Sequence, residues 1–160
     1  MGECEYRVLR AGADAERYVA GVIEMMRGLY AEDEAASKVD EAKFPATIQA
    51  FLTQPERGRV ELFLHRKDLV GYALVVPYWS NEFGGVIAFL DEMYVKPGAR
   101  GRGIGREMFA YLKRTKPFDA VAVWLEVSPK NVRARAMYEL VGLRERRNSV
   151  LVARIEDILV

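Results

Sequence analysis

Three glycines spaced two residues apart, at positions 101, 103 and 105, lie between two segments of different periodicity. The segment before them, Val86–Val95, is almost continuously apolar, as expected of a central strand that is covered on both faces. The segment after them, from Ile104 onward, repeats its apolar residues at helical spacing. Backbone amides at a glycine-rich strand-to-helix turn can converge on an anion. The sequence therefore predicts a strand–turn–helix unit with an anion site at its turn.

The order of the other periodic segments indicates the fold class. Alternating or continuously apolar segments predict strands, and apolar residues recurring every three to four positions predict helices. Strands are expected at residues 6–9, 60–65, 69–79, 86–95 and 120–127, with a closing hairpin at 143–147 and 150–155. Helices are expected at about 14–29, 40–52, 104–115 and 129–141. The last helix is expected to be capped by Ser128, with Pro129 in its first position. This order predicts an α/β fold with a mixed, mostly antiparallel central sheet and helices on both faces.

Length, charge and cysteine content limit the class of function. The chain has 160 residues, which suits a single domain over 1–160, and 24 Lys and Arg against 23 Asp and Glu give a formal net charge of +1. Dedicated nucleic-acid binders are usually far more basic, so no nucleic-acid partner is expected. No apolar stretch is long enough to span a bilayer and the first residues do not resemble a secretory signal, so we expect no membrane partner and a cytoplasmic location. With only Cys4 and His65, neither a disulfide framework nor a Cys/His zinc site can form, and we expect no metal.

The anion that suits the glycine segment best is a phosphate. Four basic residues and no acid lie between positions 96 and 106, namely Lys96, Arg100, Arg102 and Arg106. Two common phosphate-binding motifs do not fit: the dinucleotide fingerprint needs a glycine where Arg106 stands, and the P-loop needs a lysine where Ile104 stands. Nucleotide-dependent redox chemistry is therefore the poorest interpretation.

A different family fits this segment. Arg100–Gly105, RGRGIG, matches the Arg/Gln-x-x-Gly-x-Gly/Ala signature of the GNAT acetyltransferase superfamily at every defined position. The later residues Glu126–Ser128, Asn131 and Tyr138 also resemble that family's last strand and helix, and the order of elements agrees. The chain thus resembles a GNAT N-acetyltransferase. The resemblance implies acetyl-CoA as co-substrate, a primary amine of a small molecule as acceptor, and compatibility with a homodimer.

The resemblance also implies where acetyl-CoA would bind. In this family two adjacent parallel strands part, and the pantetheine arm inserts between them like a missing strand. The backbone around Met93 and Val95 would bind that arm, and the amides from Gly101 to Arg106 would hold the pyrophosphate at the start of a helix. The expected cofactor-binding residues are Met93, Tyr94, Val95, Arg100, Gly101, Arg102, Gly103, Ile104, Gly105, Arg106, Asn131 and Arg133. Arg135 is a further candidate, although a solvated charge on the helix explains it and Arg133 equally well.

Three residues are candidates for catalysis. Tyr138 matches the family's tyrosine that protonates the departing thiolate; without the resemblance it would be read as an aromatic packed at a boundary. Asp91 and Glu92 lie in an apolar strand, where carboxylates are costly to bury without a partner or a role. A carboxylate there can bind an ammonium ion and remove its proton before attack. The strand resembles the acidic strand of polyamine and diamine acetyltransferases, so we favour Asp91 as the base and Glu92 as its support.

Several alternatives remain open at the level of sequence. Neighbours in a strand point to opposite faces, so only one of the two acids should reach the acceptor unless a bulge intervenes. Either acid can instead be salt-bridged to a nearby arginine. Four residues just before the acidic strand either wall the acceptor site or pack as surface aromatics: Tyr78, Trp79, Glu82 and Phe83. Cys4 has no activating base in the pattern, which favours direct transfer in a ternary complex. A protein or peptide N-acetyltransferase and a non-catalytic acyl-CoA sensor are the rival functions.

Overall fold

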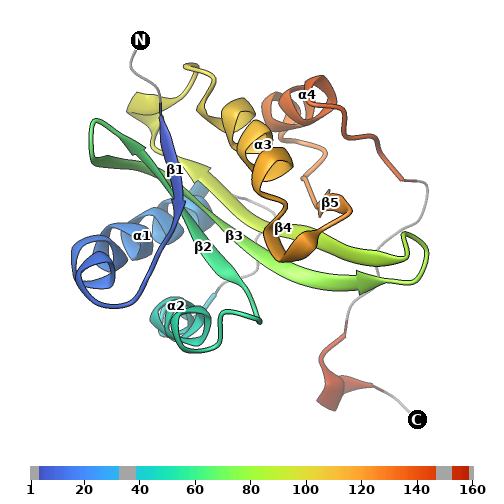
Figure 1. The fold of residues 1–160 in the computed structure, drawn as a ribbon, viewed down its shortest axis with the longest axis horizontal. Coiled ribbons are helices and arrows are strands. Elements are labelled where there is room, and N and C mark those ends of the chain that lie inside the picture. Colours follow the sequence, from blue (N-terminus) through green and yellow to red (C-terminus); the bar gives the residue numbers. More distant parts are fainter. Residues whose placement is uncertain (1–3, 33–38, 147–152, 159–160) are drawn as a thin grey trace.

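The computed structural model describes residues 4–32, 39–146 and 153–158, and its strands and helices up to residue 140 follow the order that the sequence predicts (Figure 1). The elements are β1 (Glu5–Val8), α1 (Ala13–Glu32), α2 (Lys43–Thr53), β2 (Arg59–His65), β3 (Asp68–Ser80), β4 (Gly85–Val95), α3 (Ile104–Thr115), β5 (Ala122–Leu125) and α4 (Val132–Leu140), with short 3-10 turns at Pro97–Ala99, Pro117–Asp119 and Ile155–Asp157. No helix in these described ranges is both long enough and apolar enough to cross a membrane.

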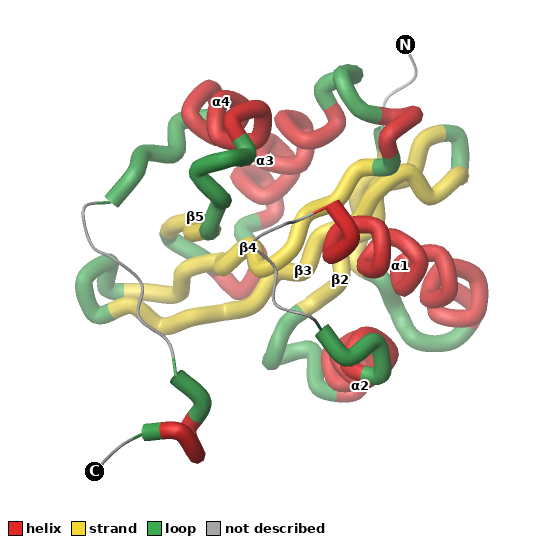
Figure 2. Tube along the Cα trace, turned by 180° about the vertical axis from the view of Figure 1, so that it is seen from behind, coloured by secondary structure: helices red, strands yellow, loops and turns green. Residues whose placement is uncertain are grey.

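The described strands form one mixed sheet in the order β1-β2-β3-β4-β5. The first four run antiparallel to their neighbours, and β5 is parallel to β4. A parallel neighbour needs a crossover, and α3 supplies it between β4 and β5. Figures 1 and 2 show α1 and α2 against one face of the sheet and α3 against the other. The predicted α/β fold, with helices on both faces of a mixed and mostly antiparallel sheet, is confirmed.

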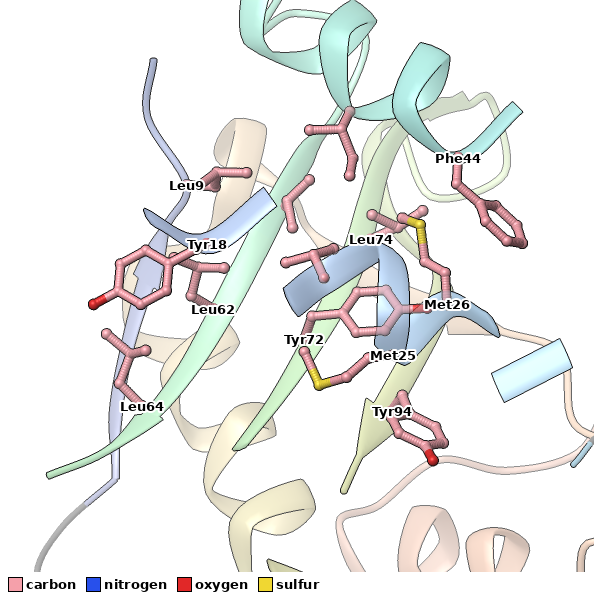
Figure 3. Packing of buried hydrophobic residues seen from close by; sticks show 13 residues of the cluster. Leu9, Tyr18, Met25, Met26, Phe44, Leu62, Leu64, Tyr72, Leu74 and Tyr94 are labelled. Carbon is pink, nitrogen blue, oxygen red and sulfur yellow. The ribbon is translucent and has the colours of Figure 1, made fainter. Parts of the chain in front are cut away.

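The two sheet faces carry separate apolar clusters because side chains alternate along each strand. Leu62 and Leu64 of β2 pack with α1 and α2, whereas Phe63 between them packs with α3. Figure 3 shows the first cluster, in which Met25 and Met26 of α1 lie over the sheet. The sheet is therefore the middle layer of a three-layer structure, and its residues near the end of β4 lie between the two helical layers.

Two details of the elements differ from the sequence prediction. β5 covers Ala122–Leu125, shorter than the predicted 120–127. The cap of α4 is Asn131 rather than Ser128: the Asn131 side-chain oxygen accepts a hydrogen bond from the Ala134 backbone at 3.1 Å, and Ser128 and Pro129 lie in the loop before it. Asparagine caps helices as well as serine does, so the helix can begin at the later of the two candidate caps.

The predicted closing hairpin is not seen in the described part of the chain. Residues 143–146 and 153–154 have no strand conformation, and the 3-10 turn at Ile155–Asp157 lies where the second strand was expected to end. The rest of the predicted hairpin, residues 147 and 150–152, lies outside the described residues. The alternation read at 143–146 is therefore a loop that follows α4.

Candidate active site

A β-bulge in β4 brings Asp91 and Glu92 to one site. Leu74 of β3 pairs with Glu92, and Val75 pairs with Leu90, so that Asp91 has no residue opposite it. The extra residue reverses the alternation of β4: Leu90 packs on the α3 side, whereas Glu92 faces α1. Without the bulge, Leu90 and Glu92 would share a face. The β-bulge that would let both acids reach one site is therefore present.

Glu92 is held by two tyrosine hydroxyls. Tyr72 of β3 donates to one carboxylate oxygen at 2.7 Å, and Tyr30 in the last turn of α1 donates to the other at 2.9 Å. Burial raises the pKa of Glu92, and the two phenolic hydrogen bonds oppose that rise because they stabilise the carboxylate. Sequence analysis did not single out Tyr30 or Tyr72, because nothing in their local pattern distinguishes them from core aromatics.

Asp91 has a different environment. It makes no hydrogen bond or ion pair with any residue in the described part of the chain, and solvent reaches it through the pocket mouth. The surrounding protein nevertheless restricts its hydration, which raises the pKa of Asp91, and the negative charge of Glu126 raises it further. Asp91 is thus a free carboxylate with an elevated proton affinity. Among the described residues, Asp91 is therefore not salt-bridged to an arginine.

One pocket joins these acids to Tyr138. Its volume is about 670 Å³, and it is lined by Leu29, Tyr30, Glu32, Leu90–Met93, Leu125–Ser128, Lys130, Asn131 and Tyr138. Tyr138 comes from α4, on the α3 side, where its ring packs edge-on against Phe109 with centroids 5.8 Å apart. Burial raises the pKa of the Tyr138 hydroxyl, so the group stays protonated and can donate a proton.

The pocket opens where β4 and β5 separate. Residues Ile87–Leu90 of β4 pair with Ala122–Leu125, but β4 continues to Val95 after β5 has ended. The Lys96 amide bonds to β3, so by alternation the backbone groups of Met93 and Val95 point toward the open side. Extended backbone groups at a parting between parallel strands can bind a strand-like amide chain.

The glycine loop has the geometry of an anion site. Gly101 and Gly103 have φ of +78° and +84°, which only glycine adopts readily, and Gly103 caps α3, so that the first amides of the helix are free to point outward. Arg133 of α4 reaches this loop: its guanidinium lies 3.7 Å from where a Cβ on Gly101 would be. Arg135 turns away and pairs with Glu145 at 3.0 Å. The loop thus combines oriented amides with one added cation.

Some candidate residues have other partners. Arg100 directs its side chain away from the loop, toward Glu32 and the Val95 carbonyl. The Asn131 side-chain oxygen is engaged in capping α4. Tyr78, Trp79 and Phe83 are exposed and do not line the pocket; Phe83 lies in a second cavity beyond β5. That second cavity is also lined by Tyr138, so the interpretation of these aromatics as walls of the acceptor site stays a prediction. No group of three or more potential metal ligands occurs within residues 4–32, 39–146 and 153–158.

Comparison with known proteins identifies the family. The sequence model of the acetyltransferase (GNAT) family matches residues 23–143. The chain belongs to the GNAT family. Uncharacterized N-acetyltransferases of Mycobacterium bovis and Mycobacterium tuberculosis are 30% identical to this GNAT protein over 115 residues, covering 71% of this chain and 70% of theirs. It is an acetyl-CoA-dependent acyltransferase.

Solved structures agree in fold. A possible acetyltransferase from Clostridium difficile has a TM-score of 0.77 at 21% identity, with 95% of this chain and 97% of that one covered. An aminoglycoside N-acetyltransferase in complex with coenzyme A has a TM-score of 0.75 at 14% identity, with 96% and 95% covered. The parted strands and the cradle at Gly101 and Gly103 fit two parts of coenzyme A, because extended backbone suits a pantetheine arm and converging amides suit a pyrophosphate.

Proposed function

We propose that this GNAT protein transfers an acetyl group from acetyl-CoA to a primary amine of a small, multiply charged cation, in a ternary complex. The observation that carries the proposal is a pocket lined by Asp91 and Glu92 of β4 and by Tyr138 of α4. Groups able to accept a proton and to donate one thus line the same pocket, which supports acid–base catalysis of acetyl transfer.

The charge of the pocket favours a cationic acceptor. Asp91, Glu92 and Glu126 line it without an ion-pair partner among the described residues, whereas the carboxylate of Glu32 is paired with Arg100. Three carboxylates in one pocket attract an ammonium ion and repel acidic acceptors. The arrangement supports a diamine or polyamine acceptor, whose second ammonium ion would pair with a carboxylate that the reacting amine does not contact.

Asp91 suits the role of base better than Glu92 does. An amine arrives as an ammonium ion and must lose a proton before its nitrogen attacks the thioester carbonyl. Asp91 is free, reaches solvent and has a raised pKa, so it can take the proton directly or through a water molecule. Both oxygens of Glu92 already accept hydrogen bonds, which suits Glu92 to orient the ammonium ion.

Tyr138 is proposed as the proton donor to the leaving group. Bound acetyl-CoA supplies an activated thioester whose sulfur departs as a thiolate. Tyr138 lines the pocket and its hydroxyl makes no hydrogen bond within the described residues, which supports donation of its proton to that sulfur. Cys4 is remote from the pocket, and burial raises the pKa of its thiol, which disfavours a covalent acetyl-cysteine intermediate. Direct transfer needs no such intermediate.

The test is an acceptor panel assayed by release of free thiol from acetyl-CoA. The panel contains diamines and triamines, monoamines of matched length, an aminoglycoside, and peptides with free N-termini. We expect diamines or triamines to have the highest kcat/KM, and Glu126→Gln to lower it for diamines more than for monoamines. A preference for peptides would favour a protein N-acetyltransferase, and coenzyme A binding without any turnover would favour an acyl-CoA sensor.

A further inference from the structure

We infer that Glu32 is a positioning residue that, through Arg100, ties the coenzyme A loop to the helix that walls the acceptor pocket. The inference deepens the proposed function and rests on it in one respect, that the loop at Gly101–Arg106 binds coenzyme A. It assigns a role to the first residue of the glycine signature that is separate from direct contact with phosphate.

Arg100 makes three contacts, all directed away from the loop that it begins. Its Nε donates to the Val95 carbonyl at 2.7 Å, at the end of β4. One terminal nitrogen donates to both carboxylate oxygens of Glu32, at 2.8 and 3.0 Å. The guanidinium also lies 5.0 Å above the Tyr94 ring. A planar guanidinium with this many partners is fixed in direction, so movement of the loop must move Glu32 or break these contacts.

Glu32 is the last residue of α1, where a negative charge is unfavourable. The helix macrodipole puts partial negative charge at the C-terminus, and the last turn of α1 has no basic residue of its own to offset it. Arg100 supplies the missing positive charge from the loop. The Tyr94 hydroxyl, at 2.9 Å, is a second donor to Glu32. The end of α1 therefore depends on Arg100 for its electrostatic stability.

The same turn of α1 holds the acceptor side of the pocket. Leu29, Tyr30 and Glu32 line the pocket, and the Tyr30 hydroxyl donates to Glu92. Fixing the turn at Glu32 therefore also fixes Tyr30, which orients the Glu92 carboxylate. A connected path of ion pair, helix turn and hydrogen bond runs from the glycine loop to Glu92, the acid proposed to orient the ammonium ion.

The consequence is coupling between the two substrate sites. Coenzyme A that orders the loop holds Arg100 in place, and Arg100 in turn reduces fraying of the last turn of α1. Such coupling is reciprocal, so an ordered α1 terminus raises the affinity for coenzyme A by the same factor, usually about 5-fold or more. Glu32 acts through Arg100 and Tyr30 rather than on the reacting atoms.

The experiment is hydrogen exchange of the amides at 28–32 with and without saturating coenzyme A, with affinity measured by calorimetry. In the wild type we expect coenzyme A to slow exchange at these amides by about 5-fold or more. In Glu32→Gln, which keeps the size of the side chain and loses its charge, we expect little slowing and a similar fold loss of affinity. Arg100→Lys, which keeps the charge and loses the forked geometry, is expected to behave in the same way.

Glu41→Gln is the matched control. Glu41 pairs with Arg27 of α1 at 2.7 Å, so this variant also removes an ion pair from α1, but one that does not reach the loop. Its coenzyme A-dependent protection should equal that of the wild type. Wild-type protection retained in Glu32→Gln, or coenzyme A binding without any protection in the wild type, overturns the inference and leaves the proposed function standing. Failure of the wild type to bind coenzyme A overturns both.

Discussion

Asp91 and Glu92 are adjacent in β4, yet one is free and the other is held on both carboxylate oxygens. The bulge separates their environments: Glu92 turns under α1 to Tyr30 and Tyr72, while Asp91 stays at the strand edge that faces the pocket. Burial raises the pKa of both acids; the phenolic donors oppose that rise at Glu92, whereas the negative charge of Glu126 adds to it at Asp91. The two acids therefore differ in their partners: Glu92 is fixed in orientation, whereas Asp91 is free to exchange a proton.

Removing the charge of Asp91 should slow turnover in a pH-dependent way. We expect Asp91→Asn to lower kcat by about 100-fold near neutral pH, the usual effect of losing a positioned base. Raising the pH should partly restore the rate, because more of the amine is then already deprotonated. The measurement is a pH–rate profile with the best amine of the acceptor panel.

Glu92→Gln is the companion variant, and it should act mainly on acceptor KM, since Glu92 orients the ammonium ion. The two roles would be exchanged if Asp91→Asn had the pH–rate profile of the wild type, while Glu92→Gln was slow near neutral pH and partly recovered its rate at higher pH. Parallel profiles in both variants would make both acids structural.

Asp91→Asn should also slightly stabilise the fold at neutral pH. Asp91 titrates at 3.8 in a model peptide, and its pKa is raised in the folded protein. A carboxyl group whose pKa is higher in the folded protein contributes to the free energy of unfolding below pH ~4. This contribution is lost as pH rises through the folded pKa, so at pH 7 the ionised side chain opposes folding. We expect Asp91→Asn to raise the Tm at pH 7 by less than about 2 °C, because solvent screens an exposed charge, and to have no effect near pH 3. Calorimetric unfolding at both pH values checks this, and a lower Tm at pH 7 would contradict it.

Gly103→Asp should abolish coenzyme A binding in a folded protein. A side chain and negative charge would enter the anion cradle at the start of α3, and we expect affinity to fall by at least about 30-fold, or about 2 kcal/mol. Gly84→Asp is the control, because Gly84 also has positive φ (+64° against +84°) and open space around its Cβ position, but lies in the β3–β4 turn. Both variants carry similar backbone strain, so equal affinity in the two would remove the site from the glycine loop. Calorimetric titration with coenzyme A measures the difference.

Tyr138→Phe should reduce turnover without loosening the structure. The ring keeps its contact with Phe109, and the lost hydroxyl makes no hydrogen bond among the described residues, so the Tm should barely change. We expect kcat to fall by about 100-fold or more, since a positioned proton donor is removed. Steady-state assays under conditions where chemistry limits the rate give the measurement.

Tyr111→Phe provides the opposite pattern. The Tyr111 hydroxyl donates to the fully buried carboxylate of Glu61 at 3.0 Å, far from the pocket. Its loss should cost about 1–3 kcal/mol and lower the Tm by several degrees while kcat stays unchanged. Wild-type kcat in Tyr138→Phe would leave that tyrosine with a packing role only.

The sequence allowed prediction of those features that depend on local pattern. Alternation and helical spacing predicted the five strands and four helices of the described fold, and the glycines predicted the turn before α3, in which Gly101 and Gly103 have positive φ. The partners of Glu92 could not be predicted, because Tyr30 and Tyr72 reach it from 62 and 20 residues away. The bulge at Asp91 was equally hidden, since it depends on how β3 pairs with β4 rather than on either strand alone.

The Glu32 ion pair was missed for a related reason. A basic residue in a glycine-rich phosphate loop is ordinarily assigned to phosphate, and only the fold brings Arg100 to a carboxylate 68 residues away. The cap of α4 shows the limit at short range, where Ser128 and Asn131 are both good caps and their sequence signals do not rank them.

Gly28 shows how a position outside the pocket lining can influence substrate use. A Cβ at this point of α1 would lie 2.7 Å from the Tyr94 hydroxyl, so the missing side chain is what lets Tyr94 donate to Glu32. A methyl group there would push the phenol aside and leave the end of the helix held by Arg100 alone. Selection for altered acceptor range should therefore recover substitutions at Gly28, and a survey restricted to pocket-lining residues would overlook them.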